Sequence, residues 1–204
     1  MDVKAHWDAV YEVKAERDMS WFEAVPATSL AMLERAGLTV ATCVLDVGGG
    51  ASRLVDALLA RGMVCLAVLD ISGVALTRTR ERLGQAASIP MWIESDVLGG
   101  WSLAPVDIWH DRAVFHFLTT VEDRGLYRAH LATTLKPGGS AIIATFAPDG
   151  PAKCSGLPVV RYSPESLAIE LGEDFTLQES APHLHLTPRG TTQSFQFSRF
   201  RRTR

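Results

Sequence analysis

The chain alternates short apolar runs with longer amphipathic segments. Four of the amphipathic segments repeat apolar residues at helical spacing, which predicts helices. Gly62 and Gly84 each close one of them, as expected at a helix end. The apolar runs are short and continuous, which indicates strands of a covered sheet. The predicted strands are 43–50, 64–70, 91–96, 106–111 and 140–146, and the predicted helices are 51–62, 71–84, 122–135 and 163–171.

This alternation predicts an α/β fold with a mostly parallel sheet and helices on both of its faces. Two late alternating runs, near 174–180 and 192–200, complete the sheet as antiparallel strands. Helical spacing over about 1–36 predicts a helical N-terminal region. The chain is long enough to bury a substantial core, and we expect a single domain over 1–204.

Composition narrows the function. The chain carries a formal net charge of −3, which argues against a protein that coats nucleic acid or an acidic membrane. The charged N-terminal stretch is unlike a signal peptide, and no apolar run is long enough to span a bilayer. Cys43, Cys65 and Cys154 form no Cys-x-x-Cys pair. We therefore expect a cytoplasmic protein with reduced cysteines, in which Cys43 and Cys65 are small hydrophobic strand residues and Cys154 is a loop residue.

Four carboxylates stand at or near the ends of successive predicted strands: Asp46, Asp70, Asp96 and Asp111. In an open parallel sheet, ligands bind beyond the carboxyl ends of the strands. Packing alone gives no reason to bring four carboxylates to one edge. We therefore expect them to mark a binding site.

The glycines at 48–50 follow the first predicted strand and precede a helix. Such a turn lets a ligand approach bare backbone at a helix N-terminus. Arg53 occupies the third glycine position of a dinucleotide motif, which disfavours a nicotinamide cofactor. Asp70 instead suits the hydroxyls of a ribose, and Asp96 suits an adenine amino group.

Together, the stretches LDVGGGAS, VLDIS and ESDV, with LKPGG before the fifth strand, resemble class I S-adenosylmethionine-dependent methyltransferases. The resemblance covers about 40–146, and Ser52 stands where the family has a third glycine. It implies a Rossmann-like, seven-stranded sheet with a cofactor-binding core at 40–146, a helical lid at 1–36 and an acceptor-site region at 147–204. It also implies S-adenosylmethionine as cofactor and S-adenosylhomocysteine as product. The implied cofactor-binding residues are Tyr11, Trp21, Asp46, Gly48, Gly49, Gly50, Asp70, Ile71, Asp96 and Val97.

In that fold the residues after the fourth strand face the transferred methyl group. Here they are His110, Asp111 and Arg112, followed by Phe115 and His116. A helix that begins at Arg112 would place Arg112 and His116 on one face. A cation lowers the pKa of a thiol, and a histidine takes up its proton near neutral pH. We therefore expect all of these residues except Phe115 to serve catalysis. Alternatively, His116 is a core histidine and Arg112 pairs with a neighbouring carboxylate.

The second half of the chain is similar to thiopurine and halide/thiol methyltransferases, and among bacterial proteins to S-methyltransferases of hydrogen sulfide and methanethiol. This similarity implies a small thiol as acceptor. The loop 147–162 is long for this fold and rich in Gly and Pro, so we expect it to be a second lid. The matching stretches are Trp109–Arg112 with His110 inserted, Asp123-Arg124 with Tyr127, and Gly156–Pro158 with Leu157 replacing a proline. The acceptor-binding residues that it implies are Trp7, Phe115, Arg161 and Tyr162.

Two other functions stay open. The stretches HWDAVYE and SWF resemble seven-strand protein-lysine methyltransferases, but Arg112 and two histidines would repel a lysine ammonium. The other is a non-catalytic S-adenosylmethionine-binding regulator, which the aromatic lid disfavours. His183 and His185 fall on one side of an extended segment, yet no third ligand is near them in sequence. The sequence therefore predicts no metal site.

Overall fold

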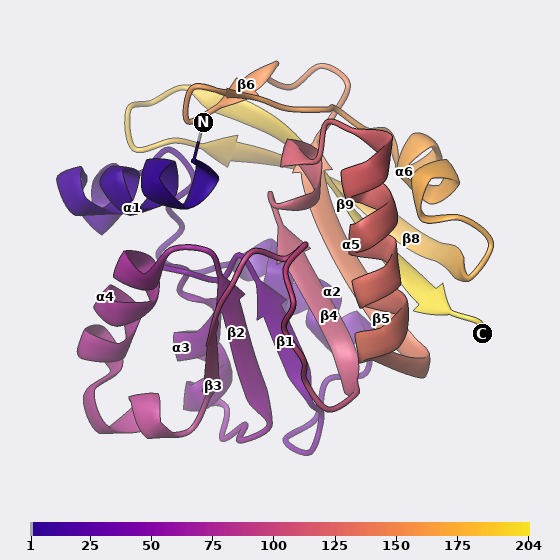
Figure 1. Cartoon of the computed structure of the whole chain (residues 1–204), viewed down its shortest axis with the longest axis horizontal. Coiled ribbons are helices and arrows are strands. Elements are labelled where there is room, and N and C mark those ends of the chain that lie inside the picture. The colour runs from indigo at the N-terminus through magenta and orange to yellow at the C-terminus, as the bar shows by residue number, and fades with distance from the viewer. Residues whose placement is uncertain (1) are drawn as a thin grey trace.

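The structure, a computed structural model, describes residues 2–204 and contains one seven-stranded sheet. The strands lie in the order β3-β2-β1-β4-β5-β9-β8 (Figure 1). Strands β1 to β5 are parallel, β9 is antiparallel to β5, and β8 is antiparallel to β9. The predicted sheet with its antiparallel C-terminal end is therefore confirmed. The strands are β1 (Val44–Val47), β2 (Leu66–Asp70), β3 (Met91–Glu94), β4 (Val106–Arg112), β5 (Leu135–Phe146), β8 (Phe175–Leu186) and β9 (Thr192–Arg202).

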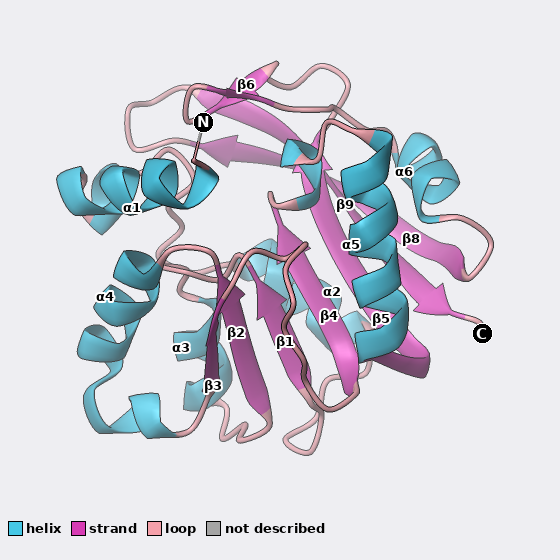
Figure 2. Cartoon of the chain, viewed as in Figure 1, coloured by secondary structure: helices cyan, strands magenta, loops and turns pink. Residues whose placement is uncertain are grey.

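Helices cover both faces of the sheet, as predicted (Figure 2). Successive strand residues point to opposite faces, so Leu45 joins one apolar core and Val44 joins the other. The first core contains side chains of α5 (Val121–Thr134) and α6 (Pro164–Leu171). The second core contains side chains of α2 (Ala27–Arg35), α3 (Leu54–Ala60) and α4 (Gly73–Leu83).

Local signals place the helix ends where the sequence predicts them. Ser163 and Ser166 form a capping box at the start of α6, with Pro164 in the first turn, and this satisfies amide groups that the helix leaves free. Gly62 and Gly84 both have positive φ angles, 79° and 56°, just after α3 and α4. Glycine adopts this backbone conformation without the strain that a side chain would cause.

The N-terminal region is helical and lies beyond the carboxyl ends of the parallel strands (Figure 1). Helix α1 (Val3–Val13) packs against α4, and the short 3-10 helix η1 (Glu16–Asp18) follows it. The loop 147–162 contains a small hairpin of β6 (Lys153–Cys154) and β7 (Leu157–Pro158). Another 3-10 helix, η2 (Gly84–Ser88), follows α4. Within residues 2–204, none of the helices has the length and apolar character needed to cross a membrane.

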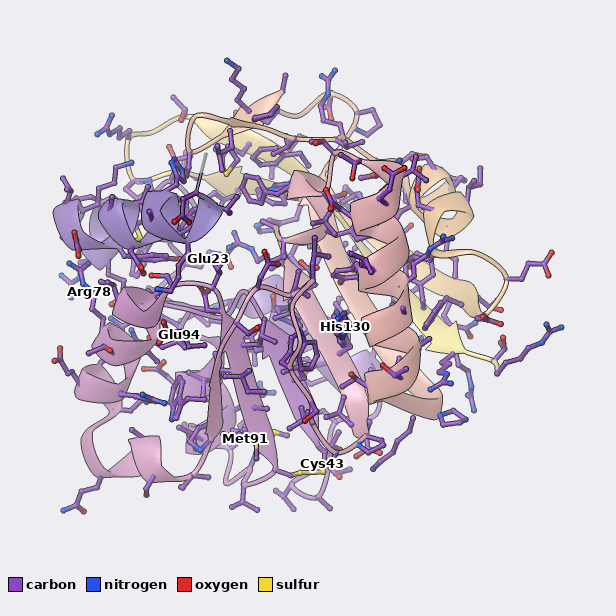
Figure 3. The ribbon with its side chains drawn as sticks, in the orientation of Figure 1. Glu23, Cys43, Arg78, Met91, Glu94 and His130 are labelled. Atoms are coloured by element: carbon purple, nitrogen blue, oxygen red, sulfur yellow. A yellow bond between two sulfur atoms is a disulfide. The ribbon has the colours of Figure 1, made fainter. Side chains whose placement is uncertain are left out.

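Two expectations about the first strands are wrong. Cys43 and Cys65 are not reduced strand residues: they form a disulfide whose Cα atoms are 4.6 Å apart (Figure 3). Each cysteine directly precedes its strand, and Val44 pairs with Leu66 in the parallel register of β1 and β2. Neighbouring parallel strands that start in the same register bring their preceding residues to disulfide distance. Cys43 and Cys65 are 22 residues apart in the sequence, so no local motif indicates that they pair.

Candidate functional site

The backbone of the turn after β1 packs closely against neighbouring side chains. Gly48 has a φ of 65°, and a Cβ there would overlap the side chain of Val114. A Cβ on Gly49 would come within 2.5 Å of Asp46 Oδ2, and one on Gly50 within 2.5 Å of Asp70 Oδ2. Since each position excludes a side chain, the three glycines let both carboxylates approach the backbone of the turn.

A cavity of about 350 Å³ opens beside this turn at the carboxyl ends of the strands. Its wall contains seven of the predicted cofactor-binding residues. Tyr11 and Trp21 come from the N-terminal region, and Gly48, Asp70, Ile71, Asp96 and Val97 come from the ends of β1, β2 and β3 or the turns that follow them. The predicted common edge for the strand ends is therefore present in the structure.

Asp70 is buried in this wall, and its Oδ1 accepts a hydrogen bond from the Ser72 amide at 2.8 Å. Burial raises the pKa of Asp70 to about 7, and the nearby charge of Asp46 acts in the same direction. A carboxylate whose charged form is disfavoured in this way is typical of a site shaped for a ligand.

A second, smaller cavity of about 50 Å³ adjoins the first on the other side of Gly48. It contains Asp46 and His110, which lie 2.7 Å apart through Oδ1 and Nδ1. His110 Nε2 lies 2.9 Å from Ser29 Oγ. Asp46 Oδ2 is buried and has no hydrogen-bond partner in the described chain. His110 therefore orients Asp46 and leaves one carboxylate oxygen free for a ligand, which differs from the predicted catalytic use of His110.

Another part of the wall of the larger cavity is mostly aromatic. Trp7 packs edge-on against Trp21 and Phe117, with ring centroids 5.9 and 5.3 Å apart. Phe195 of β9 completes the wall on the other side, and Tyr11 also contributes to it. We call Trp7, Trp21, Phe117 and Phe195 the aromatic wall. Trp7, Tyr11 and Trp21 come from the N-terminal region, so the predicted lid does border the cavity.

Arg112 places a positive charge beside the aromatic wall, and it borders both cavities. Its Nη1 donates to the Trp21 carbonyl at 3.0 Å, and Nη2 lies 3.2 Å from Glu23 Oε1. The guanidinium carbon lies 5.3 Å from the centroid of the Phe195 ring. Burial lowers the pKa of Arg112, and the charge of Glu23 opposes this shift. Arg112 Nε is buried and has no hydrogen-bond partner among residues 2–204.

Asp111 faces away from the two cavities. Its Oδ2 accepts from the Tyr127 hydroxyl at 2.7 Å, and its Oδ1 accepts from the Val114 amide at 2.8 Å. Burial raises the pKa of Asp111 to about 6, although the Tyr127 hydrogen bond opposes this shift. Ala113, between Arg112 and Val114, has a φ of 73°. Asp111 thus holds the turn that aims Arg112 and is a positioning residue.

The segment after Arg112 corrects one expectation. Strand β4 continues through Arg112, the turn at Ala113 follows, and a 3-10 helix, η3 (Phe115–Phe117), comes next. A helix beginning at Arg112, with His116 on its face, is therefore wrong. The positive φ at Ala113 breaks the helical path, and the buried carboxylate of Asp111 stabilises the break.

Six predicted site residues lie outside the walls of these two cavities: Gly50, Asp111, Phe115, His116, Arg161 and Tyr162. Phe115 and Tyr162 pack against each other in the core. Arg161 is exposed and donates to the Gly150 carbonyl at 3.2 Å. Burial lowers the pKa of His116 to about 3, and the charge of Arg112 adds to this effect. His116 Nδ1 accepts from the Phe146 amide, so this ring has the surroundings of a core histidine.

Sequence reasoning missed several wall residues. Cys154, expected to be a loop residue, lies in the cavity wall together with Gln193 and Phe195 of the C-terminal hairpin. Burial raises the pKa of the Cys154 thiol to about 11, although Ser155 and Arg112 oppose this shift. Phe195 and Gln193 alternate along β9, which was the available signal that they share a side.

No profile of a known protein family matches the chain, and no curated protein matches its sequence. Solved structures do resemble it. One comes from work on the conversion of a disulfide bond into a thioacetal group during echinomycin biosynthesis. It is 23% identical, with 98% of this chain and 92% of that chain covered and a TM-score of 0.77.

Two further structures are named methyltransferases. The 1,6-didemethyltoxoflavin-N1-methyltransferase of Burkholderia thailandensis, with 1,6-didemethyltoxoflavin and S-adenosylhomocysteine bound, is 20% identical, covers 99% of this chain and 85% of that chain, and has a TM-score of 0.70. The N-methyltransferase NodS of Bradyrhizobium japonicum WM9, in complex with S-adenosylhomocysteine, is 19% identical, covers 97% and 98%, and has a TM-score of 0.72. The chain thus has the fold of the class I S-adenosylmethionine-dependent methyltransferases.

Proposed function

We propose that the protein is an S-adenosylmethionine-dependent methyltransferase whose acceptor is the sulfur of a small thiol. One observation carries the proposal: a single cavity is lined both by Asp70, Asp96 and Gly48 and by Arg112 and the aromatic wall. We refer to these two groups of residues as the cofactor end and the acceptor end. A nucleoside and an acceptor would therefore meet inside one partly open cavity. Holding two reactants in line is the main task in such a transfer.

The residues at the first end suit this cofactor. Asp70 would accept hydrogen bonds from the ribose hydroxyls, and Ile71 and Val97 would flank the adenine. Asp96 would accept from the adenine amino group, and the free Oδ2 of Asp46 would receive the ammonium of the methionine part. When bound, the cofactor supplies a methyl group on a sulfonium, which is already electrophilic.

The residues at the second end suit a thiol. A cation beside sulfur lowers its pKa, and the thiolate is the nucleophile. The buried Arg112, with its free Nε, would stabilise that thiolate. The acceptor sulfur would form the new C–S bond as the bond between the methyl group and the sulfonium breaks, S-adenosylhomocysteine would be the leaving group, and the thiol proton would go to solvent. His116, with a pKa lowered to about 3 and no place in the cavity wall, is not needed as a base.

The size of the cavity supports a small acceptor. About 350 Å³ lies near the lower end of the range for ligand pockets, roughly 300–1,000 Å³, and both reactants share it. A protein substrate would need an open groove instead. The charge of Arg112 also opposes a lysine ammonium. These features favour the thiol over the protein-lysine alternative.

The structural neighbours suggest two kinds of methyl acceptor. The protein from echinomycin biosynthesis is connected with sulfur chemistry, which agrees with a thiol. The toxoflavin enzyme acts on a heterocyclic nitrogen, as its name says. Because aromatic rings stack on planar ligands, the aromatic wall favours a planar heteroaromatic nitrogen compound as the second candidate.

Transfer of an isotope-labelled methyl group from S-adenosylmethionine tests the proposal. The acceptor panel should contain hydrogen sulfide, methanethiol, larger thiols, planar heteroaromatic amines and lysine peptides. Labelled thioether from the small thiols would support the proposal. Labelling only of a heteroaromatic amine or a peptide would overturn the thiol acceptor, and cofactor binding without transfer to any member of the panel would indicate a regulator.

A further inference from the structure

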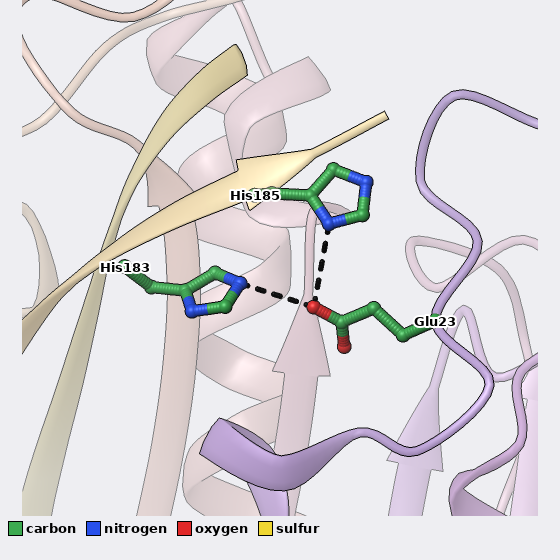
Figure 4. Close-up of side chains that lie close together, drawn as sticks. All are labelled: Glu23, His183 and His185. Atoms are coloured by element: carbon green, nitrogen blue, oxygen red, sulfur yellow. Dashed lines mark hydrogen bonds and ion pairs between the residues drawn. The ribbon is translucent and has the colours of Figure 1, made fainter. Parts of the chain in front are cut away.

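Three potential metal ligands converge beside the aromatic wall. Glu23 comes from the segment between η1 and α2, whereas His183 and His185 come from β8 (Figure 4). Glu23 Oε1 lies 3.0 Å from His183 Nε2 and 3.4 Å from His185 Nδ1. The three ligand atoms all lie within 4.8 Å of one another. Segments separated by 160 residues thus meet at one carboxylate oxygen.

These spacings fit a metal ion. Zinc binds imidazole nitrogen and carboxylate oxygen at roughly 2.0–2.2 Å, so two ligands of a tetrahedral ion lie about 3.4 Å apart. The contact of Glu23 with His185 has this spacing at 3.4 Å, and the contact with His183, at 3.0 Å, would lengthen slightly around an ion. Two histidines and one carboxylate also form a known set for divalent first-row transition metals, with positions left for water.

The outer nitrogen of each histidine already has a partner that orients the ring. His183 Nδ1 lies 3.0 Å from Thr28 Oγ1, and His185 Nε2 lies 2.7 Å from the Ser20 carbonyl. Metal-binding histidines almost always make such second bonds, which fix the tautomer and the ring orientation. The partner atoms leave His183 Nε2 and His185 Nδ1 facing Glu23.

The Ser20 contact also fixes the proton of a neutral His185. A backbone carbonyl only accepts hydrogen bonds, so Nε2 must be the donor. Nδ1 of the neutral ring then presents a lone pair to the Glu23 carboxylate, which is also an acceptor. Two acceptors 3.4 Å apart are stabilised by a cation between them. His185 and Glu23 are both largely buried, so bulk water does not relieve this contact.

Arg112 limits the strength of the site. Its Nη2 lies 3.2 Å from the same Glu23 oxygen, and its positive charge opposes a divalent ion. The other Glu23 oxygen would keep the ion pair with Arg112 while Oε1 turns to the metal. The partly exposed side chain of His183 gives the ion a route from solvent.

We propose that Glu23, His183 and His185 form a binding site for a divalent first-row transition metal ion, with Zn²⁺ as the best fit. The ion joins the N-terminal region to β8 directly behind the acceptor end of the cavity, since Phe195 packs against both histidine rings. It therefore closes the N-terminal region over the cavity. This inference is independent of the methyl acceptor and of the reaction.

The test is binding of Zn²⁺, and of Co²⁺ as a coloured probe, to the untagged, chelator-treated full chain. Equilibrium dialysis should give one tightly held Zn²⁺ per chain, and Co²⁺ should give a d–d absorption band. Glu23→Gln and His183→Gln should each weaken Zn²⁺ binding by more than about tenfold. His130→Gln is the matched control, because His130 lies on α5, stacks on Trp101 and does not belong to the three-ligand cluster.

Thermal unfolding gives a second readout, because an ion that binds only the folded chain stabilises it. Zn²⁺ should raise the Tm of the wild type and of His130→Gln but not that of His183→Gln. A His183→Gln variant with wild-type circular dichroism keeps the comparison valid. Absence of a bound equivalent in the wild type, or equal Zn²⁺ binding by wild type and His183→Gln, would overturn the proposal.

Discussion

Burying a guanidinium costs free energy, and the Arg112 side chain, which lines both cavities, is only 13% exposed. Its Nη1 donates to the Trp21 carbonyl, Glu23 faces Nη2, and Nε is left without a partner in the part of the chain that the structure describes. At the scale of single residues, this unpaired donor supports the proposed acceptor, which carries or develops negative charge.

We expect Arg112→Gln to lower the rate of methyl transfer to a thiol about 10- to 100-fold at saturating cofactor. The reason is the loss of a charge-assisted contact, worth roughly 1.5–3 kcal/mol. Without the cation, the thiol ionises at higher pH, so the pH–rate curve should also move upward. Steady-state rates between pH 6 and 10 measure both effects. Arg189→Gln, an exposed arginine, is the control, and an effect of Arg112→Gln on cofactor affinity alone would contradict the assigned role.

Asp70 gives a prediction about stability. Its pKa is about 7 in the folded chain and 3.8 in the unfolded reference. The folded state therefore binds the proton more strongly, and this residue's contribution to stability falls as pH rises from about 4 to 7. Asp70→Asn removes this loss. Its free energy of unfolding, relative to wild type, should rise by about 2–3 kcal/mol between pH 5 and pH 8.

Urea unfolding of the ligand-free chains at the two pH values measures this difference. The same variant should bind S-adenosylhomocysteine more weakly, because the amide replaces a charged acceptor. A stability difference that does not change with pH would show that Asp70 titrates normally. Residues that bind a ligand often lower the stability of the ligand-free protein.

At the scale of elements, the disulfide joins the starts of β1 and β2. It closes a loop with a sequence separation of 22, and a crosslink of this size stabilises a fold by about 2–4 kcal/mol. Replacing Cys43 and Cys65 together by alanine should lower the free energy of unfolding by that amount. Urea titration with and without reductant checks the result. Reductant should destabilise the wild type and Cys154→Ala but leave the double variant unchanged; equal sensitivity of all three would contradict a structural disulfide.

The elements themselves could mostly be predicted from the sequence, because the parallel strands are short apolar runs, the last two strands alternate, and several helices have a local end signal. The exceptions depend on contacts between distant residues. The turn at Ala113 depends on the Asp111–Tyr127 hydrogen bond, which no local pattern reveals. The Cys43–Cys65 bridge depends on the register of β1 and β2.

At the scale of the molecule, the two ends of the site differ in how well they could be predicted. The cofactor end follows from topology, since parallel strands release their carboxyl ends at one edge. The acceptor end combines the N-terminal region, the segment after β4 and the C-terminal hairpin. The sequence predicted its positive charge through Arg112. The alternation along β9 indicates only that Gln193 and Phe195 share a side of the strand, and no local pattern places them or Cys154 at the cavity. The same holds for Glu23, which meets His183 and His185 only in the fold.

The central claim is that the large cavity binds the nucleoside of S-adenosylmethionine through Asp70. Calorimetric titration with S-adenosylhomocysteine tests it most directly. We predict one binding event per wild-type chain, weakened by more than about tenfold in Asp70→Ala, which loses the charged contact to the ribose. Absence of any heat of binding at millimolar ligand, or equal affinity of the two chains, would contradict the account.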